Sequence, residues 1–98
     1  MGGDLYYIPS EKKSSWRTEV EELGFTVEDL SQRMTDADRR AFAFLGKLKN
    51  GNTERFFHLE PLEDGYMLAI RFAGKEDPEY LKRTVGSRFE PYQVESPK

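Results

Sequence analysis

The sequence predicts a single α+β domain in which helices pack on one face of a small antiparallel sheet. Two apolar-rich runs flank Asp64-Gly65, a dipeptide that favours a tight β-hairpin turn. Segments with apolar residues at helical spacing stand on both sides of this hairpin. The 98 residues, 13% of them aromatic, suit one modest core. We therefore expect one domain over residues 1–98, with residues 1–3 and 95–98 as flexible ends.

The first half of the chain is expected to hold one strand followed by three short helices. Residues 4–9 (DLYYIP) are aromatic and β-branched, which is typical of a strand, and Pro9 ends it. Trp16, Val20 and Leu23 follow at helical spacing, and Gly24 is a natural stop. Capping-box-like starts at Thr26 and Thr35 predict two further helices. The inner side of the second of these helices would carry Ala37, Ala41, Phe44, Leu45 and Leu48.

The hairpin is expected to have one apolar face and one mixed face. If Asp64-Gly65 is a two-residue turn, Glu63 lies opposite Tyr66 and Phe57 lies opposite Phe72. Side chains alternate along a strand, so Phe57, Leu59, Leu68, Ile70 and Phe72 share the core face. The mixed face is too apolar for a surface left in water. It carries Phe56, His58, Glu60, Leu62, Met67, Ala69 and Arg71.

The last part of the chain is expected to add a helix and a strand. Asp77-Pro78 is a helix start, and residues 88–94 suit an edge strand that Pro91 limits. The resulting order is β-α-α-α-β-β-α-β, with a ferredoxin-like type of layering. The alternative is a winged-helix-like arrangement, in which three helices within residues 10–73 precede the hairpin as a wing.

Composition excludes several classes of chemistry. The chain has no cysteine, so disulfides and thiolate sites are excluded. No apolar run approaches the roughly 20 residues of a membrane span, and the N-terminus lacks a signal-peptide pattern. A soluble cytoplasmic protein without a membrane partner is the default expectation. The net charge of −3 argues against general nucleic-acid binding, although lysine and arginine residues cluster between Arg39 and Arg55.

No catalytic set or cofactor motif is evident in the sequence. His58 is the only histidine, and a lone histidine usually lacks the partners that a general base needs. A zinc site needs more histidine or cysteine ligands than the chain offers. The scattered glycines make no phosphate-binding loop. We therefore expect no cofactor and no metal, and a binding module more than an enzyme.

Three functional hypotheses remain open. The first is a non-catalytic protein-interaction or regulatory module that binds a protein partner or a second copy of itself. Its interaction-face candidates are Phe42, Phe56, His58, Leu62, Met67 and Arg71. The second is a nucleic-acid-binding, winged-helix-like regulator that uses Arg39, Arg40, Lys47, Lys49 and Arg55. The third is a small ligand-binding domain or enzyme centred on His58.

Overall fold

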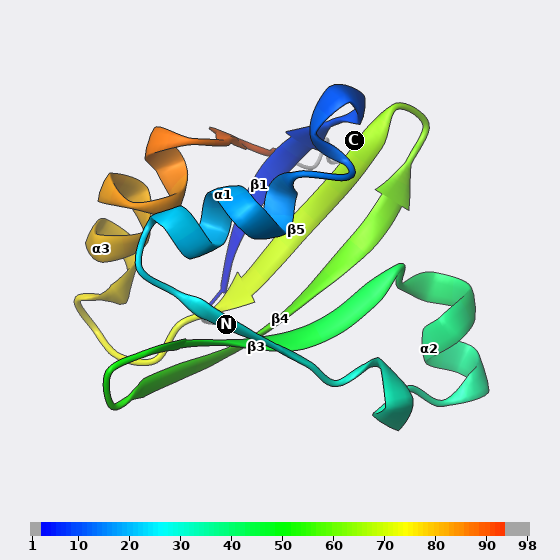
Figure 1. Cartoon of the computed structure of the whole chain (residues 1–98), viewed down its shortest axis with the longest axis horizontal. Helices are drawn as coiled ribbons and strands as arrows, with labels where there is room; N and C mark the ends of the chain where they lie inside the picture. Colours follow the sequence, from blue (N-terminus) through cyan, green and yellow to red (C-terminus); the bar gives the residue numbers. More distant parts are fainter. Residues whose placement is uncertain (1–2, 94–98) are drawn as a thin grey trace, which may run out of the picture.

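The computed structural model describes residues 3–93, which form one six-stranded antiparallel sheet and three α-helices (Figure 1). The strands lie in the order β2-β3-β4-β5-β1-β6. Their bounds are Gly3–Pro9 (β1), Thr26–Asp29 (β2), Phe44–Asn50 (β3), Thr53–Leu62 (β4), Gly65–Arg71 (β5) and Glu90–Pro91 (β6). The helices are Trp16–Glu22 (α1), Asp36–Ala41 (α2) and Asp77–Arg83 (α3). Single 3₁₀ turns occupy Ser10–Lys12, Ser31–Arg33 and Val85–Ser87.

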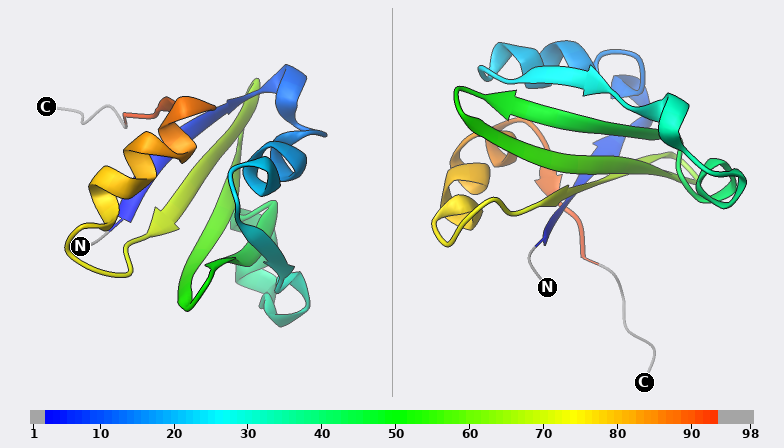
Figure 2. Two further views of the ribbon diagram at one scale, coloured as in Figure 1. Left: turned by 60° about the vertical axis from the view of Figure 1, so that its left-hand side comes forward. Right: turned by 90° about the horizontal axis from the view of Figure 1, so that it is seen from below.

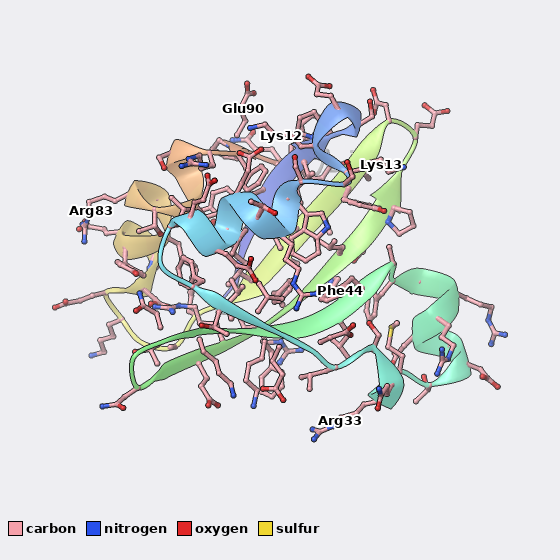
Figure 3. All side chains as sticks on the ribbon, in the orientation of Figure 1. Lys12, Lys13, Arg33, Phe44, Arg83 and Glu90 are labelled. Atoms are coloured by element: carbon pink, nitrogen blue, oxygen red, sulfur yellow. The ribbon has the colours of Figure 1, made fainter. Side chains whose placement is uncertain are left out.

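The core lies between α1, α3 and one face of the sheet. Trp16 of α1 meets the ring of Phe44 edge-on at 5.2 Å and that of Phe57 at 5.9 Å, and Phe44 lies beneath α1 in Figure 3. Leu81 of α3 and Val85 after it are fully buried in the same cluster. The sheet is strongly twisted, and α2 lies apart from the other two helices (Figure 2). The expected α+β class is confirmed, with a larger sheet than the sequence suggested.

The hairpin faces are as expected, but the register differs by two residues. Phe57 pairs with Ile70 and Leu62 pairs with Gly65, so Glu63 and Asp64 connect the strands. The expected pairing of Phe57 with Phe72 is therefore wrong. A shift of two residues keeps every side chain on its face. The core face was therefore predicted correctly, although the turn is formed by Glu63 and Asp64 and not by Asp64 and Gly65.

Contact with β1 explains the position of Gly65. Its φ is +156°, and an added Cβ would lie 2.1 Å from the carbonyl oxygen of Ile8. Gly65 pairs with Pro9 of β1, so the backbone of the neighbouring strand occupies that space. No non-glycine residue in the described part of the chain has positive φ, which excludes the expected type I′ turn. The glycine is required by strand packing instead of by the turn.

The two helices expected between Thr26 and residue 50 are largely wrong. Residues 26–29 form β2, and Asp29 accepts a 2.8 Å bond from the Ser31 N–H instead of capping a helix. The second start is real, because Thr35 and Asp38 form a reciprocal capping box. That helix, however, ends at Ala41, and the next residues form β3.

Packing explains why residues 44–50 form a strand. Gly46 is buried, and an added Cβ would lie 2.7 Å from the Glu28 carbonyl oxygen and 2.8 Å from the Phe44 and Phe57 rings. Only glycine fits at that point, and glycine weakens a helix. Lys47 and Lys49 alternate with Gly46 and Leu48, a period of two that suits a strand. The winged-helix alternative fails because its third helix is largely β3.

The ends of the chain need two corrections. Gly3 belongs to β1 and pairs with Arg71, so it is not part of a loose end. The expected strand over 88–94 is reduced to Glu90–Pro91, which pairs with β1. Residues 1–2 and 94–98, which include most of the ends expected to be flexible, lie outside the described residues. In the part of the chain that the structure describes, no helix has the length and apolar character to cross a membrane.

Candidate functional site

A row of four side chains crosses the sheet face opposite the core. Direct pairing places Leu5 of β1 beside Ala69 of β5, Ala69 beside His58 of β4, and His58 beside Leu45 of β3. Because Ala69 is the smallest member, the surface is hollowed at the middle of the row. These four residues line a groove of about 730 Å³. We call this surface the open face.

Phe42 forms one wall of the groove. Its ring stacks on His58 with the centroids 4.1 Å apart and the planes inclined by 30°. The backbone at Phe42 is extended, and the next N–H, that of Ala43, donates to the Leu59 carbonyl at 2.7 Å. This bond fixes the chain after α2 against β4. His58 Nε2 also lies 3.0 Å from Glu60 Oε2 on the same strand. The imidazole is thus held in position on two sides.

Phe56 and Arg71 form the other wall. Phe56 is 49% exposed and is the one large apolar side chain within residues 3–93 that is classed as exposed. The Lys47 ammonium lies 4.9 Å above its ring centre and 3.3 Å from Glu54, a cation–π contact that leaves about half of the Phe56 side chain exposed. Arg71 is exposed and forms no ion pair with the described residues. Phenylalanine and arginine are both residue types that are enriched at protein–protein interfaces.

The structure brings four of the six predicted interaction residues to this groove. Phe42, Phe56, His58 and Arg71 line it, whereas Leu62 and Met67 do not. Met67 lies on the same face but is only 8% exposed. The floor residues Leu5, Ala69 and Leu45 lie around His58 through strand pairing. Leu5 was missed because its pairing with β5 is a long-range contact, and Leu45 because it was assigned to a helix.

The basic residues proposed for nucleic-acid binding do not form one surface. Lys49 lies 2.9 Å from Glu28, a contact that raises the pKa of Lys49 and lowers the pKa of Glu28. Arg55 is only 5% exposed and is bound to Asp77 on the core side of the sheet. Arg39 and Arg40 are exposed in the last turn of α2. Neighbouring carboxylates thus engage part of this set, and burial removes Arg55 from the surface.

The groove contains no evident catalytic arrangement. Within residues 3–93 no group of three or more histidine, cysteine or carboxylate side chains is placed to hold a metal ion. The polar contact of His58 is to Glu60, and its ring face is covered by Phe42. An apolar floor with aromatic walls is suited to receiving side chains of another molecule. No protein-family model, curated protein or solved structure matches the chain.

Proposed function

We propose that this protein is a non-catalytic interaction domain whose open-face groove receives an apolar side chain of a protein partner. The observation that carries the proposal is the exposure of Phe56, at 49%, beside an apolar groove of about 730 Å³. Fully burying an exposed aromatic side chain contributes roughly 1.5–3 kcal/mol, and covering the exposed half of Phe56 contributes about half of this. A partner that covers Phe56 and fills the hollow above Ala69 gains this energy without first reorganising the sheet.

The charges around the groove indicate the chemistry of the partner. Arg71 and Asp4 line the groove, and the Asp4 carboxylate accepts from the Tyr6 hydroxyl at 2.6 Å. Arg39 and Arg40 lie on α2, just before Phe42. None of these three arginines has an ion pair within residues 3–93. Complementary charge favours correct docking and faster association. We therefore propose a partner segment with apolar side chains flanked by aspartate or glutamate.

We also interpret the fold as a ferredoxin-like unit with an added pair of antiparallel strands. β1, α1, β4, β5, α3 and β6 follow one another in the βαββαβ order, with the four strands placed β4-β5-β1-β6. β2 and β3 extend this unit beyond β4. The extension supports the proposed function because β3 contributes Leu45 to the groove.

The test is partner capture with matched variants. Immobilised wild-type protein and the variants Phe56→Ser, Ala69→Glu and Leu62→Ser are incubated with lysate of the native host, and captured proteins are identified by mass spectrometry. Leu62 is the control, because it shares the strand and face of Phe56 but does not line the groove. Thermal melting checks that each variant is folded.

The proposal requires a partner that binds wild type and Leu62→Ser and is lost with both groove variants. Its purified form should then bind Phe56→Ser at least about tenfold more weakly. Equal capture by all four proteins would refute the proposal. Analytical ultracentrifugation tests the alternative occupant, since a wild-type dimer that Ala69→Glu dissociates would assign the groove to a second copy.

The nucleic-acid hypothesis has weaker support from the geometry. Arg39 and Arg40 are exposed, but Lys49 is paired and Arg55 is buried. Phosphate contacts need cations that can reach the backbone of the nucleic acid. A salt-dependent mobility shift of a DNA or RNA probe that disappears in Arg39→Glu/Arg40→Glu would favour this hypothesis. No shift at low salt would remove it.

A further inference from the structure

Arg55 is held on the core side of the sheet by three neighbours. Its Nε donates to Asp77 Oδ2 at 2.6 Å, and its Nη2 donates to Asp77 Oδ1. The ring of Tyr80 lies 5.1 Å from the guanidinium carbon, and the ring of Phe25 lies 5.7 Å from it. Asp77 itself is 8% exposed and also accepts a 2.7 Å bond from the Ala73 N–H. The guanidinium is therefore held by the Asp77 carboxylate at one edge and by the two aromatic rings.

The remaining edge of this guanidinium has no partner. Arg55 Nη1 is the buried side-chain polar atom that lacks a hydrogen bond within residues 3–93. A buried donor without a partner costs about 1–3 kcal/mol, so native proteins rarely leave one. Because Asp77 takes the Nε and Nη2 edge, Nη1 is the guanidinium nitrogen left without an acceptor, and a ligand reaches this buried atom only if side chains that line the adjoining hollows shift.

Two adjoining hollows lie against Arg55. A larger one of about 730 Å³ is lined by Ala73, Asp77, Tyr80 and the ends of α3, and it is open to solvent. A smaller one of about 300 Å³ is lined by Asn50, Thr53, Arg55 and Tyr80. Both therefore share Thr53, Arg55 and Tyr80. Lys75 and Arg83 line the larger hollow, and Arg83 projects from α3 in Figure 3.

The polar groups around the shared wall are mainly hydrogen-bond donors. The hydroxyl oxygen of Tyr80 accepts from Asn50 Nδ2, so its own proton is free to donate. Arg55 Nη1 carries two further donors. A ligand that binds here must supply acceptors.

We propose that this hollow is a binding site for a carboxylate group, held by Arg55 Nη1 and the Tyr80 hydroxyl. A carboxylate offers one acceptor oxygen for each of these two donors, and hydrogen bonds to charged groups are the stronger kind. Lys75 and Arg83 form no ion pair within residues 3–93 and add attraction at the entrance. Glu76, Glu79 and Asp77 also line the hollow, and their repulsion is about half as strong for a monoanionic carboxylate as for a dianion such as phosphate. The site is separate from the groove, since Arg55 and Phe56 point to opposite faces of β4.

A carboxylate can come from a free organic acid or from the C-terminus of a peptide, and the probes separate these sources. Amide signals of ¹⁵N-labelled protein are followed by NMR during titration with sodium acetate, sodium benzoate, and a short peptide in free-acid and C-terminally amidated forms. Acetamide, sodium chloride and inorganic phosphate are the controls. The expected result is saturable shifts at Ala73, Asp77 and Tyr80 with carboxylates only. Tighter binding of benzoate or of the free-acid peptide assigns the source.

The variants keep the test independent of Arg55, because replacing Arg55 alone leaves the buried Asp77 carboxylate unpaired and is expected to destabilise the protein strongly. Tyr80→Phe keeps the ring over the guanidinium and removes one donor, so carboxylate binding should weaken at least about fivefold. Tyr7→Phe is the matched control, because the Tyr7 hydroxyl donates to the Asp64 carbonyl elsewhere. Absence of saturable shifts with every carboxylate refutes the proposal. Equal shifts with acetamide, or unchanged affinity in Tyr80→Phe, refute it as well.

Discussion

The buried pair of Arg55 and Asp77 allows the most demanding test of how this fold is held together. The Asp77 carboxylate accepts from Arg55 Nε, Arg55 Nη2 and the Ala73 N–H. In Asp77→Asn the guanidinium stays buried and loses its counter-charge. Removing one partner of a buried ion pair costs about 3–5 kcal/mol. Since a small domain has about 5–15 kcal/mol in total, this variant should lose a large share of its stability.

Urea denaturation at neutral pH, followed by circular dichroism, measures this loss. In a thermal melt the same loss should lower the melting temperature by at least about 12 °C, at roughly 4–8 °C per kcal/mol. Glu79→Gln is the control, because Glu79 is exposed in the same helix, and it should stay within about 0.5 kcal/mol of wild type. The double variant Arg55→Met/Asp77→Leu buries no charge and should recover at least half of the loss. A cost below about 1 kcal/mol for Asp77→Asn would refute this account of the pair.

Three further predictions concern acid, a close backbone contact and a helix cap. Hydrogen bonds from Arg55 lower the pKa of Asp77 below 3.8, so its stabilisation is complete above about pH 4 and lost as pH falls through the folded-state value. Acid titration monitored by tryptophan fluorescence should show this loss of stability, and Asp77→Asn should lack the part of the loss that comes from protonation of Asp77. Gly65→Ala should destabilise by about 3 kcal/mol or more in urea denaturation, because Cβ would overlap the Ile8 carbonyl. Gly74→Ala, with open space around its Cβ, should stay within about 1 kcal/mol, and equal effects would contradict the overlap. Thr35→Ala removes a bond to the Asp38 N–H and should raise amide exchange in α2, with a cost of about 0.5–2 kcal/mol; unchanged exchange would contradict a stabilising cap.

Local signals predicted the parts of the fold that local interactions determine. The helical spacing of Trp16 and Val20, the Asp77-Pro78 start and the alternation along the hairpin are all visible in short windows. β2 and β3 were missed because their stability comes from contacts distant in sequence. Gly46 is the clearest case, since the Phe57 ring that excludes a side chain there lies eleven positions along the chain. Tertiary packing overrode the helical pattern of residues 37–48.

The candidate sites divide in the same way. Phe56, His58 and Arg71 share one strand face of a hairpin, so alternation alone placed them together. Ala69 was on the predicted face, but only the pairing of β1 with β5 makes it the floor of a groove. The carboxylate site was not foreseen, because Arg55 and Tyr80 meet only after α3 packs on the sheet.

The edges of the sheet determine how a partner can approach. β2 presents Glu28 and Asp29, and the Val27 carbonyl is occupied by a 3.2 Å bond from Arg17. At the other edge, β6 is two residues long and includes Pro91, which has no N–H to donate. Such edges resist the addition of a further strand and the edge-to-edge aggregation that follows from it. We therefore expect a partner to recognise side chains on a face of this domain more readily than an extended peptide would add a strand at these edges of the described sheet.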